Sequence, residues 1–205
     1  DGVLVDSEPL AMRVLIEAIA AQGIEIPSDQ AFRSFLGRSL ASISASLHDS
    51  HGEPLGPAAL ASMRHDLYAL YRRELEPMPG VEAALDALAI PYCVASSSSL
   101  ERIRLSLEVT GLIGRFEPNI FSASMVANGK PAPDLFLHAA AAMRASPANC
   151  LVIEDSPAGI AAARRAGMAV FAFTGGNQIE ALAPDAIFND MQSLPALVSS
   201  LQSKR

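Results

Sequence analysis

After residue 75, short apolar runs alternate with segments whose apolar residues recur every three or four positions. The runs predict buried strands, and the second period predicts amphipathic helices. Strands are expected at 90–95, 119–123, 150–153, 168–173 and 186–188, and helices around 81–88, 103–107, 131–143, 156–166 and 194–201. Apolar strands that alternate with helices are typical of an α/β protein with a parallel sheet covered on both faces.

Residues 9–76 have a different pattern, because helical periodicity occurs there without a convincing strand. Helical segments are expected at 10–19, 28–35, 40–48 and 58–74, separated by glycine and proline. An all-helical stretch just after an α/β signature indicates an inserted bundle. The sequence therefore predicts two domains, a core formed by 1–8 with 77–205 and a helical insertion at 9–76.

The composition is that of a globular protein, since 50% of the 205 residues are hydrophobic and 18% are charged. The formal net charge of −7 disfavours non-specific binding to nucleic acid or to anionic membranes, but not a small anion in a local basic pocket. Cys93 and Cys150 lie in apolar runs and suggest neither a disulfide framework nor a zinc site. With no long apolar run and no signal peptide, we expect a cytoplasmic protein. The sequence leaves the oligomeric state open, and a monomer is the expectation.

Four polar clusters lie at the ends of the predicted strands or just beyond them. They are DGVLVDSE at 1–8, ASSSS at 95–99, GKPAPD at 129–134 and IEDSPAGI at 153–160. Ligands of open parallel sheets bind outside the carboxyl ends of the strands. The fold is therefore expected to bring the four clusters together.

The residue types in these clusters suit phosphoryl transfer. The adjacent carboxylates of Glu154 and Asp155 repel each other unless a cation neutralises them, and Mg²⁺ with several retained waters is the usual one. The Ser96 hydroxyl and the following backbone amides can hold phosphate oxygens. Lys130 can neutralise developing negative charge. Asp1 can give a proton to a leaving alcohol and take one from water.

Each cluster also has an ordinary structural interpretation when it is taken alone. Asp-Gly is a common turn, and strand ends often carry exposed acids. Serines such as Ser99 and Ser156 often cap helices. The four clusters together, in this order, favour the functional interpretation.

With these motifs, the sequence resembles the haloacid dehalogenase-like hydrolase superfamily, in its branch of sugar-phosphate phosphatases and β-phosphoglucomutase-like proteins with a helical cap. The resemblance runs essentially from end to end of the chain. It implies a Rossmann-like core, a cap inserted after the first strand, and Mg²⁺-dependent phosphoryl transfer through an aspartyl-phosphate. The substrate it implies is a small phosphorylated metabolite, such as a sugar or polyol phosphate.

The resemblance also implies a role for each matching residue. Asp1 matches the aspartate that acts as general acid and base, and its backbone carbonyl would help to hold Mg²⁺. Ser96 matches the hydroxyl that binds the transferring phosphoryl group, and Lys130 matches the charge-neutralising lysine. Glu154 and Asp155 match the metal carboxylates.

The family's aspartate nucleophile stands two positions before the residue that Asp1 matches. It is not among the given residues, and neither is the apolar strand that carries it at the centre of the family's sheet. We expect both to lie upstream in the full protein. A chain that lacked them is expected to bind Mg²⁺ without covalent turnover.

Four further residues are candidates for substrate binding. Ser97 and Ser98 would contact the phosphoryl group or the substrate. In the helical insertion, Gly37 permits a tight turn, and Arg38 is expected to meet a second anionic or hydroxyl-rich part of the substrate. A solvated loop cation is the ordinary alternative for Arg38.

Three other functions fit the sequence less well than a phosphatase. β-Phosphoglucomutase members carry a cap histidine and a cap arginine where this chain has Ala11 and Leu40, so the sequence favours hydrolysis over a mutase. True dehalogenases do not need the metal pair at 154–155. Phospho-receiver domains, which switch rather than turn over, carry their acidic pair early and lack a helical insertion.

Overall fold

The computed structural model describes residues 1–27, 34–35, 40–51, 55–174 and 182–203. The chain divides into two compact units, one formed by 1–6 with 76–205 and the other by 7–75.

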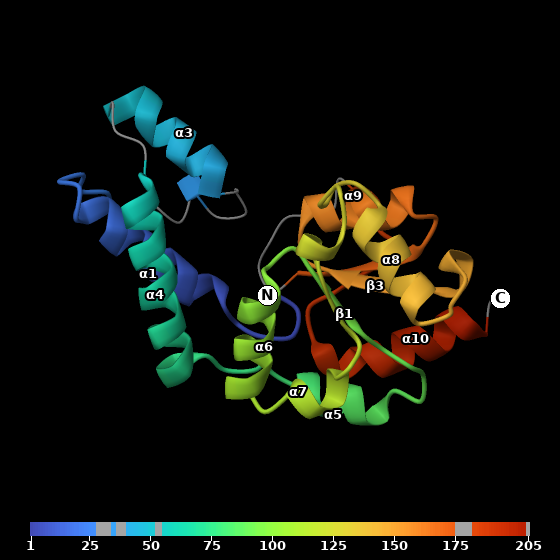
Figure 1. Cartoon of the computed structure of the whole chain (residues 1–205). Helices are drawn as coiled ribbons and strands as arrows, with labels where there is room; N and C mark the ends of the chain where they lie inside the picture. The colour runs from blue at the N-terminus through green and yellow to red at the C-terminus, as the bar shows by residue number, and fades with distance from the viewer. Residues whose placement is uncertain (28–33, 36–39, 52–54, 175–181, 204–205) are drawn as a thin grey trace. The chain divides into compact units, whose positions relative to one another are not determined.

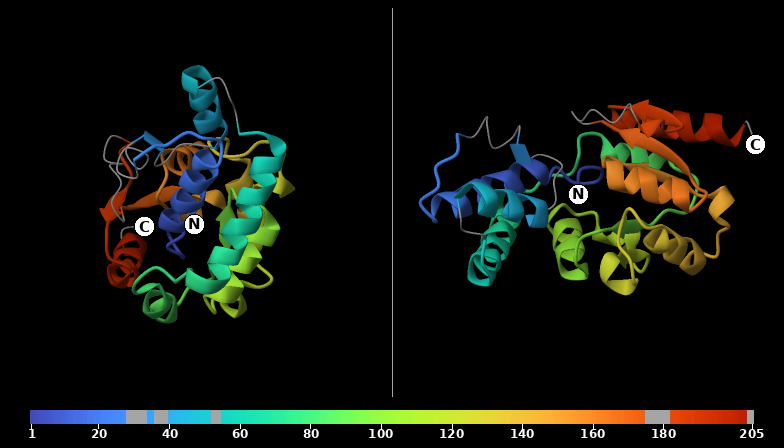
Figure 2. Two further views of the ribbon diagram at one scale, coloured as in Figure 1. Left: turned by 90° about the vertical axis from the view of Figure 1, so that its left-hand side faces the viewer. Right: turned by 90° about the horizontal axis from the view of Figure 1, so that it is seen from above.

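The unit at 7–75 is helical. Its helices are α1 (Glu8–Ala20), α3 (Leu40–His51) and α4 (Pro57–Glu74). Helices α1 and α4 pack side by side (Figure 2, blue and blue-green) and bury Ile19 and Tyr71 to 1% exposure each. The helices expected at 10–19, 40–48 and 58–74 are present, and most of the helix expected at 28–35 lies outside the described residues. No helix within the described ranges is long and apolar enough to cross a membrane.

The other unit is an α/β structure with parallel strands, as expected. Its strands are β1 (Val94–Ser96), β2 (Ile120–Ser122), β3 (Leu151–Glu154), β4 (Ala169–Phe173) and β5 (Ala186–Phe188). Its helices are α5 (Val81–Ala87), α6 (Leu100–Val109), α7 (Ile113–Phe116), α8 (Asp134–Ala142), α9 (Pro157–Arg165) and α10 (Leu194–Gln202). Three short 3₁₀ turns are η1 (Ala123–Met125), η2 (Pro147–Asn149) and η4 (Met191–Ser193).

The strands form two parallel sheets rather than the single one expected. β1 pairs with β2, and β4 lies between β3 and β5. Among the described residues no strand joins β1 to β3, so the two-stranded and the three-stranded sheet are not continuous. The carboxyl end of β1 is Ser96 and that of β3 is Glu154, so each sheet ends at a predicted site residue.

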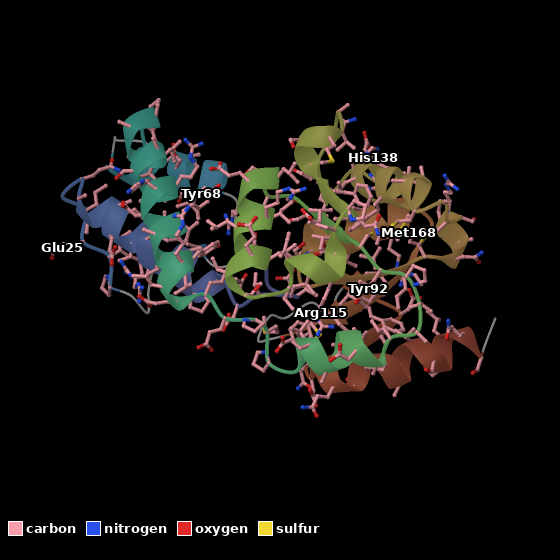
Figure 3. The ribbon with its side chains drawn as sticks, turned by 60° about the horizontal axis from the view of Figure 1, so that its bottom comes forward. Glu25, Tyr68, Tyr92, Arg115, His138 and Met168 are labelled. Atoms are coloured by element: carbon pink, nitrogen blue, oxygen red, sulfur yellow. The ribbon has the colours of Figure 1, made fainter. Side chains whose placement is uncertain are left out.

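The strand expected at 90–95 is shorter than predicted and begins only at Val94. Pro91 has no backbone N–H for a strand ladder. The ring of Tyr92 packs edge-on against that of Phe116, with centroids 5.3 Å apart. Tyr92 lies near Arg115 in Figure 3, and both Arg115 and Phe116 belong to α7. This four-residue helix is too short to leave a periodic signal in the sequence.

The core of this unit lies between the sheet of β3 and β4 and helix α9. Its most buried members, at 0% exposure, are Ile160, Ala162, Ala163, Val170 and Ala172. The alanines let α9 approach the strands closely, and Met168 (Figure 3) closes the cluster at the start of β4. Figure 1 shows α8 and α9 along one side of β3 and α5 and α10 along the other. The strands are therefore covered by helices on both sides.

Candidate active site

The opening residues of the chain form a turn that is tied to the segment before α5. The Asp6 N–H donates to the Glu76 carbonyl at 3.1 Å, and the Met78 N–H donates to the Leu4 carbonyl at 2.9 Å. These bonds fix the backbone on which Asp1 stands.

Gly2 places this turn directly against Asp155. Its φ of +69° lies in the left-handed region, and a β-carbon there would lie 1.8 Å from Oδ2 of Asp155. Only glycine fits without displacing the carboxylate. The carboxylate of Asp155 therefore lies beside the backbone of the opening turn, although more than 150 residues separate the two in sequence.

The serine segment after β1 begins α6 and contacts Asp1. The Ser99 hydroxyl caps the helix by accepting a hydrogen bond from the Arg102 N–H at 3.3 Å. The Ser98 hydroxyl donates to Oδ2 of Asp1 at 2.7 Å, and the Ser98 N–H donates to Oγ of Ser96 at 3.1 Å. The Arg102 guanidinium pairs with the same Asp1 oxygen at 3.3 Å.

The end of β2 supports the serine segment through the hydroxyl of Ser122. Ser122 stands opposite Ser96 in the strand register and is fully buried. Its hydroxyl donates to the Ser98 carbonyl at 2.7 Å and lies 2.9 Å from the hydroxyl of Ser124. The backbone of Ser98 is thus held at both its N–H and its carbonyl.

Lys130 joins the ends of β1 and β3. Its ammonium donates to the Ala95 carbonyl at 3.0 Å and forms an ion pair with Oε1 of Glu154. It also lies 4.6 Å from the centre of the Phe136 ring, a cation–π contact. The side chains of Lys130 and Glu154 are each only 8% exposed. A positive charge is therefore fixed one residue from Ser96, in a largely water-free place.

The N-terminus of α9 holds the other oxygen of Glu154. Oε2 accepts hydrogen bonds from the Ser156 N–H at 3.2 Å and from the Ser156 hydroxyl at 2.8 Å. The same hydroxyl caps α9 by accepting from the Gly159 N–H at 3.0 Å. A β-carbon on Gly159 would lie 1.9 Å from Cδ of Glu154, so glycine here makes room for the carboxylate.

Contacts join four separate segments of the chain at this site. Asp1 pairs with Arg102, and Gly2 lies against Asp155. Lys130 bonds to the Ala95 carbonyl, next to Ser96, and pairs with Glu154. The structure therefore brings the opening turn, the end of β1, Lys130 and the acidic pair at 154–155 together.

The oxygen donors near Asp1 suit a hard cation such as Mg²⁺. Within the described ranges, no group of three or more histidine, cysteine, aspartate and glutamate side chains is arranged to hold a metal. Glu154 faces Lys130 and Ser156, which leaves the Asp155 carboxylate beside the Asp1–Gly2 backbone as the fitting donors. Mg²⁺ needs only one or two carboxylates, since it retains waters and binds substrate phosphate.

The substrate contacts expected of Ser97, Ser98, Gly37 and Arg38 stay predictions. Gly37 and Arg38 lie outside the described residues, and Ser97 is exposed beside Ser96. Sequence reasoning missed Arg102 and Ser122, which contact the site through Asp1 and Ser98. Neither belongs to a recognisable motif, and only the fold reveals their contacts.

The described residues form an α/β fold whose polar side chains gather at the carboxyl ends of parallel strands. The haloacid dehalogenase-like hydrolase family matches residues 1–167, and the chain belongs to this family. The family and the α/β fold expected from the sequence are thereby confirmed.

Named relatives share most of the chain. It is 32% identical to the 6-phosphogluconate phosphatase of Escherichia coli over 174 residues, which cover 84% of this chain and 79% of that one. It is 30% identical to the fructose-1-phosphate phosphatase YqaB of E. coli over 170 residues, or 82% and 89%. A solved haloacid dehalogenase-like protein of unknown function from Agrobacterium tumefaciens matches with a TM-score of 0.88 at 33% identity, covering 98% and 96%. The expected class, a phosphoric monoester hydrolase, is the class of these named phosphatases.

Proposed function

We propose that this protein is a Mg²⁺-dependent phosphatase that hydrolyses a small phosphorylated metabolite, a sugar or polyol phosphate. The observation that carries the proposal is the buried Lys130 ammonium, held between the ends of β1 and β3 beside Ser96. A fixed positive charge in a dry place stabilises the charge of a transferring phosphoryl group more strongly than it would in water. Relatives named for sugar and hexitol phosphates support the substrate class.

In the first step, the Ser96 hydroxyl and Lys130 bind the phosphoryl group. The family's nucleophilic carboxylate, expected two positions before Asp1, bonds to phosphorus as the bond to the alcohol oxygen breaks. Asp1 gives its proton to that oxygen, so a neutral alcohol leaves. The products of this step are the alcohol and an aspartyl-phosphate.

In the second step, Asp1 takes a proton from water as the water oxygen bonds to phosphorus. The acyl phosphate bond breaks, which releases inorganic phosphate and restores the nucleophilic carboxylate. Mg²⁺, held by Asp155 and by oxygens of Asp1 with Glu154 behind them, would neutralise the phosphate and the nucleophile.

The helical unit at 7–75 serves in this proposal as a cap that excludes water and contributes specificity. Gly37 and Arg38 would contact the anionic or hydroxyl-rich part of the substrate that lies away from the reacting phosphate. A cytoplasmic location and a monomeric state remain predictions from the sequence.

Phosphate release from a panel of phosphorylated sugars and polyols, with Mg²⁺ or EDTA, tests the proposal. We expect release with Mg²⁺, loss in EDTA, and loss of metal-dependent turnover in Asp155→Ala. Asp86→Ala, which removes a carboxylate that pairs with Arg115 of α7, is the matched control. Undiminished release in EDTA would refute the metal role. Conversion of a sugar 1-phosphate to its 6-phosphate without net release would identify a mutase instead.

A further inference from the structure

Arg102 lies in the first turn of α6 and belongs to none of the four polar clusters. It lines a small cavity together with Asp1, Ser96 and Ser98. Its guanidinium pairs with Oδ2 of Asp1 at 3.3 Å, and the two side chains are 27% and 31% exposed. Arg102 is therefore close to the group proposed to transfer protons, but it is not a fully solvated cation.

Two donors converge on one oxygen of Asp1. The Ser98 hydroxyl reaches Oδ2 at 2.7 Å, and Arg102 reaches the same atom. Both donors stand on fixed backbone, since Ser98 is bonded to Ser96 and Ser122 and the N–H of Arg102 is bonded to the Ser99 cap. Both donors lie where β1 leads into α6. Together they restrict the orientation of the carboxylate more than either donor would alone.

A general acid works only within hydrogen-bond distance of the oxygen it protonates. A displacement of about 1 Å can lower a rate by about 10²-fold. We infer that Arg102 is a positioning residue, which with Ser98 fixes the Asp1 carboxylate for proton transfer. The inference rests on the proposed phosphatase function. It differs from a substrate-binding role, in which the guanidinium would contact the phosphoryl group itself.

The test compares two phosphate esters with the full-length wild-type protein and Arg102→Ala in Mg²⁺. The first is the best sugar phosphate of the panel, whose alcohol needs a proton to leave. The second is p-nitrophenyl phosphate, whose phenolate leaves without one. Because kcat/KM reports the step in which the ester bond breaks, we expect a loss of about 10–100-fold on the sugar phosphate and less than about 3-fold on the aryl ester. Arg102→Lys is expected to recover part of the loss.

Arg104→Ala is the matched control, since Arg104 lies on the same helix but pairs with Glu117 outside the site. We expect it to leave both rates unchanged. The Asp1→Asn variant completes a double-mutant cycle, because Arg102→Ala should cause little further loss once the carboxylate is gone.

The outcomes separate this inference from the function on which it rests. Equal losses on both esters, or a full additional loss in the Asp1→Asn background, would show that Arg102 binds substrate or maintains structure, and would overturn the positioning role alone. If the wild-type protein hydrolyses no phosphate ester, the proposed function fails and the inference fails with it.

Discussion

Two ion pairs of the α/β unit differ in how far water reaches them. Lys130 and Glu154 are each 8% exposed, whereas Asp1 and Arg102 are 31% and 27% exposed. The buried pair has additional partners on both sides, which compensate the cost of removing two charges from water. The outer pair needs less compensation, because water still reaches it. The buried pair therefore suits a fixed charge, and the outer pair suits a group that exchanges protons with substrate and water.

The largest effect is expected from Lys130→Met, which removes the positive charge of the buried pair. This variant leaves the Glu154 carboxylate buried without its counter-ion, so we expect unfolding free energy to fall by about 3–5 kcal/mol. We also expect kcat to fall by at least about 10²-fold, since a fixed positive charge is lost from the site. Urea denaturation and phosphate-release kinetics measure the two effects.

The double variant Lys130→Met/Glu154→Gln separates stability from chemistry. It removes both charges while a side-chain oxygen remains to accept from Ser156. Most of the lost stability should return, and the activity should not. Recovery of activity would show that the Lys130 charge has no part in the reaction.

A medium effect is expected from Gly159→Ala. The added methyl would overlap the Glu154 carboxyl group and push it from Lys130, at a cost of about 1–3 kcal/mol in unfolding free energy. Gly114→Ala makes the same change in α7, where nothing lies within 4 Å of the added carbon. That control should be neutral or stabilise by about 0.5–1 kcal/mol. If both variants respond alike, the space at position 159 does not hold the carboxylate in place.

The smallest effect is expected at an exposed pair in the helical unit, Arg13 with Glu74 at 2.7 Å. The hydrogen bond from Arg13 lowers the pKa of Glu74 below its usual 4.5, so the folded state favours the carboxylate. The pair therefore stabilises the fold above pH 4.5. This contribution to the free energy of unfolding is lost as the pH falls through the lowered pKa of Glu74.

Thermal unfolding of wild type and Glu74→Gln across this range measures the effect of that pair. Their melting temperatures should differ slightly at neutral pH and converge in acid. A constant difference at all pH values would show that the Arg13 contact acts through packing rather than charge.

The sequence predicted where the strands end better than it predicted which atoms touch. Ser96 and Glu154 stand at strand ends, and this placement follows from apolar runs that stop at polar residues. The Ser98 hydroxyl donates to Asp1, 97 positions away in sequence, and the sequence did not predict this bond. Such a partner depends on how strands pair in space, which no local spacing records.

Element boundaries also follow the sequence where its period is clear and depart from it where tertiary contacts intervene. Helices α4 and α10 begin and end close to their predicted residues, because their apolar faces are long enough to give a clear period. β1 begins four residues later than expected, at Val94, since Pro91 and the packing of Tyr92 interrupt an apolar run that looks continuous in sequence. Tertiary contacts overrode the local pattern there.

Gly2 offers a practical marker for related sequences. The carboxylate of Asp155 occupies volume that every other amino acid would fill with its first side-chain carbon. A protein that carries, for example, alanine at the equivalent place must hold its acidic partner differently. A single letter in an uncharacterised genome can thus flag a member in which this carboxylate is placed differently.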